Sequence, residues 1–249
     1  MEQKLGRLPA MVITILAALA AYFLRLRQLE TAFDEAGRVL TDLKPGLFTW
    51  VCVLVVVLFA VYSFLLRPRK QYSALTDRSP ILLGLTIAVS LGMIVGCVAM
   101  ALALEQLGDV LLAAGGVITA ILWGVVGLDR YRGRQIPAAM FMVSALFYAI
   151  HLIYVFRDWS QDPQILDYCF DLLAMISIMC ATFHLGGFCF DKGSRRLTVF
   201  FCFCGVIFGA AALAGGSLPE VGMTGGAMLW LLVNLHVLLR PARKRDAKA

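Results

Sequence analysis

The sequence is divided into eight long apolar segments, and this division constrains its fold more than any other feature. The segments lie at about 8–24, 47–66, 81–104, 110–128, 136–156, 168–190, 197–214 and 220–239. A helix rises 1.5 Å per residue, so roughly 20 apolar residues cross the hydrocarbon core of a bilayer. The sequence therefore predicts an all-α, polytopic membrane protein, with residues 1–249 forming one transmembrane domain, a bundle of about eight transmembrane helices.

The composition supports this interpretation and excludes a nucleic-acid-binding domain. Hydrophobic residues make up 61% of the chain and charged residues only 15%, whereas a soluble domain is about half apolar and about a quarter charged. The net charge is +6, but the basic residues stand in short groups between the apolar segments. We therefore expect the lipid bilayer and its anionic headgroups as partners, and no nucleic acid.

The distribution of basic residues predicts the orientation in the membrane. If the segments alternate in direction, 17 of the 22 Lys and Arg residues fall on the side of the N-terminus and five on the other side. Short cytoplasmic loops carry the excess of Lys and Arg in membrane proteins. We therefore predict that the N- and C-termini are both cytoplasmic and that the protein is a multi-pass protein of the cell (plasma) membrane.

One connection, residues 25–46, is long and is predicted to be an amphipathic loop on the outer side. On a helical wheel its apolar side chains share one face, with the charged residues opposite; these apolar residues are Leu29, Phe33, Ala36, Leu40 and Leu43. An interfacial helix explains this pattern. A hairpin that turns at residues 34–37, with Gly37 at positive φ, explains it too, and the sequence leaves both open.

The start of this connection also carries a resemblance. The run from Arg27 to Glu35, Arg-Gln-Leu-Glu-Thr-Ala-Phe-Asp-Glu after a first span, resembles a stretch of uncharacterised bacterial polytopic membrane proteins. The resemblance implies a bacterial origin and carries no activity with it.

Small residues recur at four-residue spacing in the third and fourth apolar segments. The glycines of these stripes are Gly84, Gly92, Gly96, Gly116 and Gly124. Such stripes let helix backbones approach closely, and this close packing drives helix association in lipid. We predict that they pack helices within the chain; a homodimer or a membrane protein partner is the alternative.

A polar group in the outer half of the bundle is the main candidate ligand site. Ionisable side chains inside a membrane are costly and mark binding sites or proton paths. A pair between His151 and Asp171 is geometrically reasonable, and the hypothesis adds Tyr148 and Tyr154 on the face of His151 and Asp167 one turn before Asp171. The alternatives are a histidine that satisfies a core hydrogen bond and a carboxylate hydrated at the surface.

A second polar group lies toward the inner side. His184, Asn234 and His236 form a possible cluster, for which structural hydrogen bonding is the favoured role. The three histidines of the chain lie on three segments at two depths and do not make a metal site. The seven cysteines all lie within apolar segments as small hydrophobic residues, so we predict no metal and no cofactor.

Motifs of the common enzyme classes are missing from the sequence. The chain has no GxSxG, HExxH or P-loop motif, and no glutamate lies in the interior of an apolar segment, where a zinc peptidase would need one. The first hypothesis is a small transporter or permease-like protein with its site in the outer half of the bundle. The alternatives are a non-catalytic membrane subunit, sensor or accessory protein, and an intramembrane lipid-modifying enzyme.

Overall fold

The protein forms an all-helical bundle in a computed structural model that describes residues 7–32, 47–103, 107–159 and 169–240. The described residues make eight α-helices and two short 3-10 helices, and no strand. They are α1 (Arg7–Ala32), α2 (Leu47–Leu65), η1 (Tyr72–Leu75), α3 (Pro80–Ala103), α4 (Leu107–Arg132), α5 (Ala138–Trp159), α6 (Cys169–Gly187), η2 (Phe188–Phe190), α7 (Arg195–Ala212) and α8 (Leu218–Leu238). All eight α-helices are long and apolar enough to cross a membrane. The prediction of an all-α fold with about eight such helices is confirmed.

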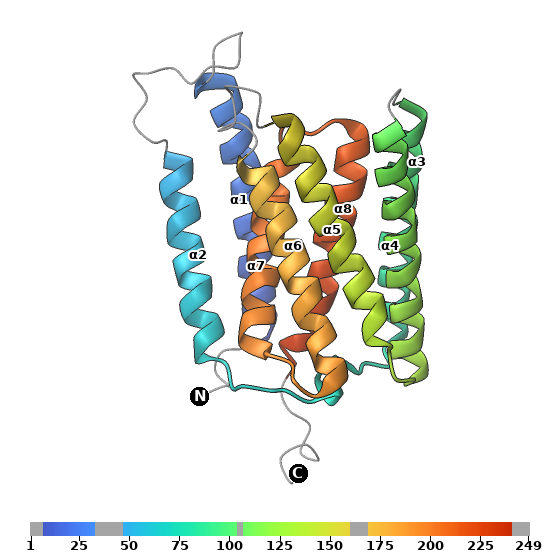
Figure 1. Ribbon diagram of the computed structural model, residues 1–249. Helices are drawn as coiled ribbons and strands as arrows, with labels where there is room; N and C mark the ends of the chain where they lie inside the picture. The colour runs from blue at the N-terminus through green and yellow to red at the C-terminus, as the bar shows by residue number, and fades with distance from the viewer. Residues whose placement is uncertain (1–6, 33–46, 104–106, 160–168, 241–249) are drawn as a thin grey trace.

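Six of the helices close into a ring, and two lie outside it. Around the ring the order of contacts is α4, α3, α8, α7, α6, α5 and back to α4, and the contact between α4 and α5 is the sparsest. Helices α1 and α2 pack on the outside of α7 (Figure 1). The interior of this six-helix ring is therefore where buried polar side chains from different helices can meet.

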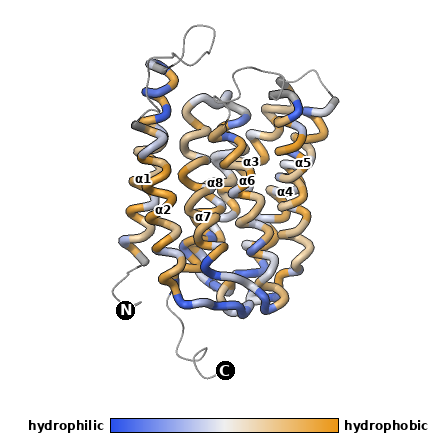
Figure 2. Tube along the Cα trace, turned by 60° about the vertical axis from the view of Figure 1, so that its left-hand side comes forward, coloured by the Kyte–Doolittle hydropathy of each residue, from blue (hydrophilic) through white to orange (hydrophobic). Residues whose placement is uncertain are grey.

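Polar residues concentrate at one end of the bundle. Helix α1 begins and α8 ends at this end, and the connections 66–79, 133–137 and 191–194 cross it (Figures 1 and 2). These connections and the helix ends beside them hold most of the basic residues, so we call it the basic end and the other the opposite end. The even number of helices places both termini of the helical bundle on the same side.

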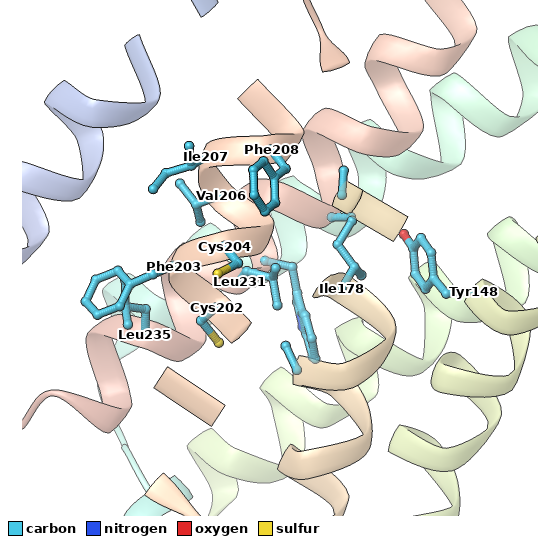
Figure 3. Packing of buried hydrophobic residues seen from close by; sticks show 14 of the residues in the cluster. Tyr148, Ile178, Cys202, Phe203, Cys204, Val206, Ile207, Phe208, Leu231 and Leu235 are labelled. Carbon is cyan, nitrogen blue, oxygen red and sulfur yellow. The ribbon is translucent and has the colours of Figure 1, made fainter. Parts of the chain in front are cut away.

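Apolar side chains cover the outside of the bundle as well as its core. On α2, Val53, Val57 and Val61 are each about half exposed. Helix α7, by contrast, is largely buried, and its side chains meet those of α6 and α8 in the core (Figure 3). A surface this apolar is unfavourable in water and is the arrangement expected of a protein surrounded by lipid.

Helix α1 is longer than the apolar segment that predicts it. It continues to Ala32, eight residues past the expected end at residue 24. Arg25 is buried at this point; its Nη1 donates to Gln28 Oε1 at 2.8 Å, and its guanidinium lies 5.1 Å from the centre of the Phe170 ring. The helix can therefore keep a charged residue inside the bundle. The rest of the predicted loop, residues 33–46, lies outside the described residues. The helix and hairpin alternatives for that stretch therefore both stay predictions.

The glycine stripes divide into two groups. A Cβ on Gly96 would stand 2.7 Å from Gly222 Cα, so the backbones of α3 and α8 touch there. Gly116 and Gly124 of α4 similarly adjoin side chains of α3. In contrast, Gly84 and Gly92 have open space around them. In-chain packing therefore does not account for these two glycines, because α3 turns their face outward.

Arginine side chains close the helices at the basic end. Arg195 Nε donates to the Leu238 carbonyl at 2.7 Å, and Arg196 Nε donates to the Leu66 carbonyl at 2.9 Å. The last carbonyls of a helix have no partner within it and carry partial negative charge. These arginines therefore cap the C-terminal ends of α8 and α2, which gives the buried Arg195 a structural role.

Candidate functional site

An aromatic cluster fills part of the ring interior. It consists of Trp123 on α4, Phe147, Tyr148 and His151 on α5, and Trp230 on α8, and we call it the central aromatic cluster. The Trp123 ring stacks on Trp230, with centroids 4.2 Å apart and planes at 8°, and lies nearly parallel to Tyr148, with centroids 6.1 Å apart. Each of the five side chains is less than a tenth exposed.

Helical spacing explains why these residues meet. Tyr148, His151 and Tyr154 follow one another at three-residue intervals on α5, so they share one side of the helix. The rings of Tyr148 and His151 lie 6.4 Å apart, and Phe147 contacts both. Tyr148 lies beside the core residues of α6, α7 and α8 in Figure 3.

Several buried polar atoms of this cluster have no hydrogen-bond partner. They are Trp123 Nε1, Tyr148 Oη and His151 Nδ1. Thr119 Oγ1, one turn before Trp123, is in the same state. Elsewhere in the bundle, Ser63 Oγ and Ser90 Oγ also have no partner, whereas Thr182 donates to the Ile178 carbonyl of its own helix at 2.7 Å.

A bound polar molecule would supply hydrogen bonds to these unpartnered atoms. A buried polar group without a hydrogen bond costs about 1–3 kcal/mol, and water is the first candidate to relieve such a cost where polar partners converge. Tyr148 Oη can donate and accept, Trp123 Nε1 can only donate, and the His151 ring can donate from one nitrogen and accept at the other. Because the cluster holds no carboxylate, guanidinium or ammonium group, this set suits a neutral polar molecule.

A row of residues on one face of α4 runs from the central aromatic cluster to a charged residue near each end of the bundle. Asp109, Gly116, Trp123 and Arg130 are spaced seven residues apart, which is nearly two full turns, so they lie in one row. At the opposite end, Tyr154 Oη donates to Asp109 Oδ1 at 3.1 Å.

The same row reaches the basic end at Arg130. Its Nη2 donates to Asn234 Oδ1 at 2.8 Å, and Asn234 Nδ2 in turn donates to the Trp230 carbonyl at 2.8 Å. The face of α4 thus links the central aromatic cluster to polar groups near both ends.

The predicted outer group is only partly assembled. Tyr148 and His151 belong to the central aromatic cluster, and Tyr154 lies beyond it with Asp109. Asp171 stands half-buried in the first turn of α6, and no hydrogen bond or ion pair joins it to His151, whose Nδ1 has no partner. The predicted His151–Asp171 pair is therefore not formed, because His151 lies with the rings of its own helix. Asp167 lies outside the described residues.

The predicted inner cluster separates in the same way. Asn234 is fully buried and bonded to Arg130. His184 instead stacks on the Phe201 ring of α7, with centroids 5.5 Å apart. His236 is half-buried, two residues after Asn234 on α8, and so points to a different side of that helix. Among the described residues no group of three or more His, Cys, Asp or Glu side chains could hold a metal ion.

Trp123, Trp230, Asp109 and Arg130 are not among the predicted site residues. Asp109 and Arg130 lie at segment ends in the sequence. Charged residues are expected there, so their presence does not indicate a site. The seven-residue spacing from Asp109 through Trp123 to Arg130 was the available signal. The stacking of Trp123 on Trp230 has no such signal, because it joins residues 107 positions apart.

Comparisons of the chain with protein-family models, with curated proteins and with solved structures find no match. Function must therefore be argued from the chemistry of the site itself.

Proposed function

We propose that this protein is a small transporter or permease-like protein of the plasma membrane that passes small neutral polar solutes through the centre of its six-helix ring. The observation that carries the proposal is the set of unpartnered polar atoms on Trp123, Tyr148 and His151, buried where the surroundings are apolar. A solute with hydroxyl or amide groups would satisfy these atoms in turn, and a passing water molecule would do so between solutes.

The surrounding structure supports a path to this site. Tyr154 and Asp109 offer hydrogen bonds between the opposite end and the cluster. The sparse contact between α4 and α5 is where the ring can widen with the least loss of packing. In this proposal the basic end is cytoplasmic, because it holds the excess of Lys and Arg, and the resemblance of residues 27–35 favours a bacterial membrane.

The test is solute permeability in proteoliposomes. Vesicles containing the purified full-length protein are mixed with glycerol or urea in a stopped-flow light-scattering experiment, with protein-free vesicles alongside. We expect faster equilibration with the protein present. Tyr148→Phe removes one oxygen and should slow the protein-dependent rate several-fold, since one hydrogen bond contributes about 0.5–1.5 kcal/mol.

A matched control separates this effect from a general loss of fold. Tyr131→Phe makes the same change on an exposed side chain of α4 and should leave the rate unchanged. Equal rates in protein-containing and protein-free vesicles would refute the proposal. Equal rates for wild type and Tyr148→Phe would show that the central aromatic cluster is not part of the proposed solute path.

A second function, a membrane subunit or accessory protein, is favoured by one specific observation. Gly84, Ala88 and Gly92 form an exposed row on α3, with open space at both glycines. Such a row lets another helix approach closely. A stoichiometric partner protein that co-purifies with the wild type and is lost on Gly92→Leu would favour this alternative over transport.

A further inference from the structure

The connection between α2 and α3 crosses the basic end of the six-helix ring. It comprises residues 66–79, with the short helix η1 in its middle, and we call it the strap. Helix α2 packs outside the ring on α7, whereas α3 belongs to the ring between α4 and α8. The strap therefore leads from a helix outside the ring to one within it, and in Figure 1 it runs beneath the bundle from α2.

On one side the strap is bonded to the segment that joins η2 to α7. The backbone N–H of Gly193 donates to the Lys70 carbonyl at 3.1 Å. Asp191, in the same segment, accepts the Tyr72 backbone N–H through Oδ1 at 2.7 Å. Because η2 follows α6 directly, these two hydrogen bonds hold the strap beside the basic ends of α6 and α7.

On the other side the strap is bonded to the segment that joins α4 to α5. Tyr72 Oη donates to the Arg134 carbonyl at 2.9 Å and accepts the Ile136 backbone N–H at 2.8 Å. Asp77 also forms an ion pair with Arg240, which follows α8. The strap then continues into α3, so it meets the basic ends of all six ring helices. A single short connection can do this only by lying over the mouth of the ring.

Helix η1 places an apolar side chain on the inner side of the strap. Leu75 is fully buried and belongs to the hydrophobic core of the bundle, whereas Gln71, Ser73 and Thr76 are exposed. Helix η1 also contacts α8 and η2. An apolar side chain in this position disfavours water and polar solutes, so the strap closes the mouth of the ring at the basic end.

Tyr72 links this closure to the part of the ring that can widen with the least loss of packing. The contact between α4 and α5 is the sparsest in the ring, and the Tyr72 hydroxyl is bonded to the segment between these two helices. A separation of α4 from α5 at the basic end would move the backbone of this segment. Both hydrogen bonds of the hydroxyl would then break, and the strap would be released on that side.

We propose that the strap is the gate at the basic end of the solute path and that the Tyr72 hydroxyl holds it closed. The gate opens when α4 and α5 separate, and it then connects the central aromatic cluster to the solution at the basic end. This inference rests on the proposed transport of neutral solutes, because a gate has a role only where a solute passes. It adds a regulated step to that transport, since local opening of the strap sets the rate of passage.

The first measurement reads the closure without any solute flux. Val126 is buried on α4 between Trp123 and Arg130, so Val126→Cys places a thiol inside the ring. The purified full-length protein in nonionic detergent is treated with a charged maleimide, and the label at position 126 is followed by peptide mass spectrometry. Adding Tyr72→Phe should raise the labelling rate about tenfold, because two hydrogen bonds no longer oppose opening.

The second measurement is the permeability of proteoliposomes to glycerol or urea, with Val126 retained. Tyr72→Phe should raise the protein-dependent rate several-fold, because a larger fraction of the protein has an open strap. Asp77→Asn weakens the ion pair of the strap with Arg240 and should act in the same direction. It carries the test if Tyr72→Phe does not fold. Tyr131→Phe removes the same oxygen from an exposed side chain of α4 and should change neither rate.

The two measurements separate the failure of the gate from the failure of the proposed function. Equal labelling rates in wild type, Tyr72→Phe and Asp77→Asn overturn the gate, as does an unchanged permeability in variants that label faster. An equal rise in labelling for Tyr131→Phe overturns it too. In each of these cases the wild type still transports. If wild-type and protein-free vesicles equilibrate at the same rate, the proposed function fails, and the gate fails with it.

Discussion

The contact between Gly96 of α3 and Gly222 of α8 permits a quantitative test of the fold. A Cβ added to Gly96 would stand 2.7 Å from Gly222 Cα and 2.8 Å from its carbonyl carbon, whereas ordinary contacts begin near 3.4 Å. Because both obstructing atoms belong to the backbone, no side chain can rotate away. The two helices must therefore separate by at least about 0.7 Å, and forcing an extra methyl group into a packed interior costs about 1–3 kcal/mol.

The matched control lies one turn earlier on the same helix. Gly92 belongs to the same small-residue stripe, but no atom lies within 4 Å of its added Cβ. We expect Gly96→Ala to lower the free energy of unfolding by about 1–3 kcal/mol and Gly92→Ala to change it by no more than about 0.5 kcal/mol. The assay is denaturation of the purified protein by SDS in mixed micelles, followed by circular dichroism and tryptophan fluorescence.

The outcome discriminates between two roles of the small-residue stripe of α3: packing against α8 and packing against a helix of another protein. Equal stability of wild type and Gly96→Ala would refute the close approach of α3 and α8. A large loss of stability for Gly92→Ala, in turn, would show that the outer face of α3 is covered by another helix, and would strengthen the accessory-subunit alternative.

Two further predictions concern the basic end. Asn234→Leu removes the hydrogen-bond acceptor of Arg130 and should lower the free energy of unfolding by about 1–3 kcal/mol in the same denaturation assay. Asn234→Asp should keep this hydrogen bond. An equal loss of stability in both variants would contradict this reasoning. Burial raises the pKa of Tyr72 above its ordinary value of 10.0, against the opposing effect of the Ile136 backbone N–H. The neutral phenol donates to the Arg134 carbonyl at 2.9 Å, so its contribution to stability is present below pH 10 and is lost as pH rises through the raised pKa. Ultraviolet titration of tyrosinate should lose one component that titrates above pH 10 in Tyr72→Phe, and an unchanged titration curve would exclude the assignment.

The positions of the helices were largely predictable from the sequence. Each apolar segment coincides with one helix, and the starts of α2 and α3 fall within one residue of prediction. The ends were less predictable wherever a charged residue lies inside a helix. Arg25 continues α1 because Gln28 and the Phe170 ring accommodate its side chain, and only one of these partners is close in sequence.

The candidate site was predictable only where its residues share one helix. Tyr148 and His151 were predicted to lie together, and they do, because three-residue spacing on a helix decides it. The predicted pair between His151 and Asp171 was based on the similar depth of the two residues in the membrane. Equal depth does not place two side chains on facing sides, and in the structure His151 lies with Tyr148 and Phe147.

The number of helices, their order and the basic character of one end were all predictable without the tertiary structure. Each of these properties follows from local composition, because a bilayer requires every span to be apolar and helical along its whole length. Which face of each helix is buried becomes evident only in the folded bundle. The spans are apolar on nearly all sides, so hydrophobicity could not select the face. That choice was made by shape and by pairing at particular places: Gly96 against Gly222, Trp123 on Trp230, and Arg130 with Asn234.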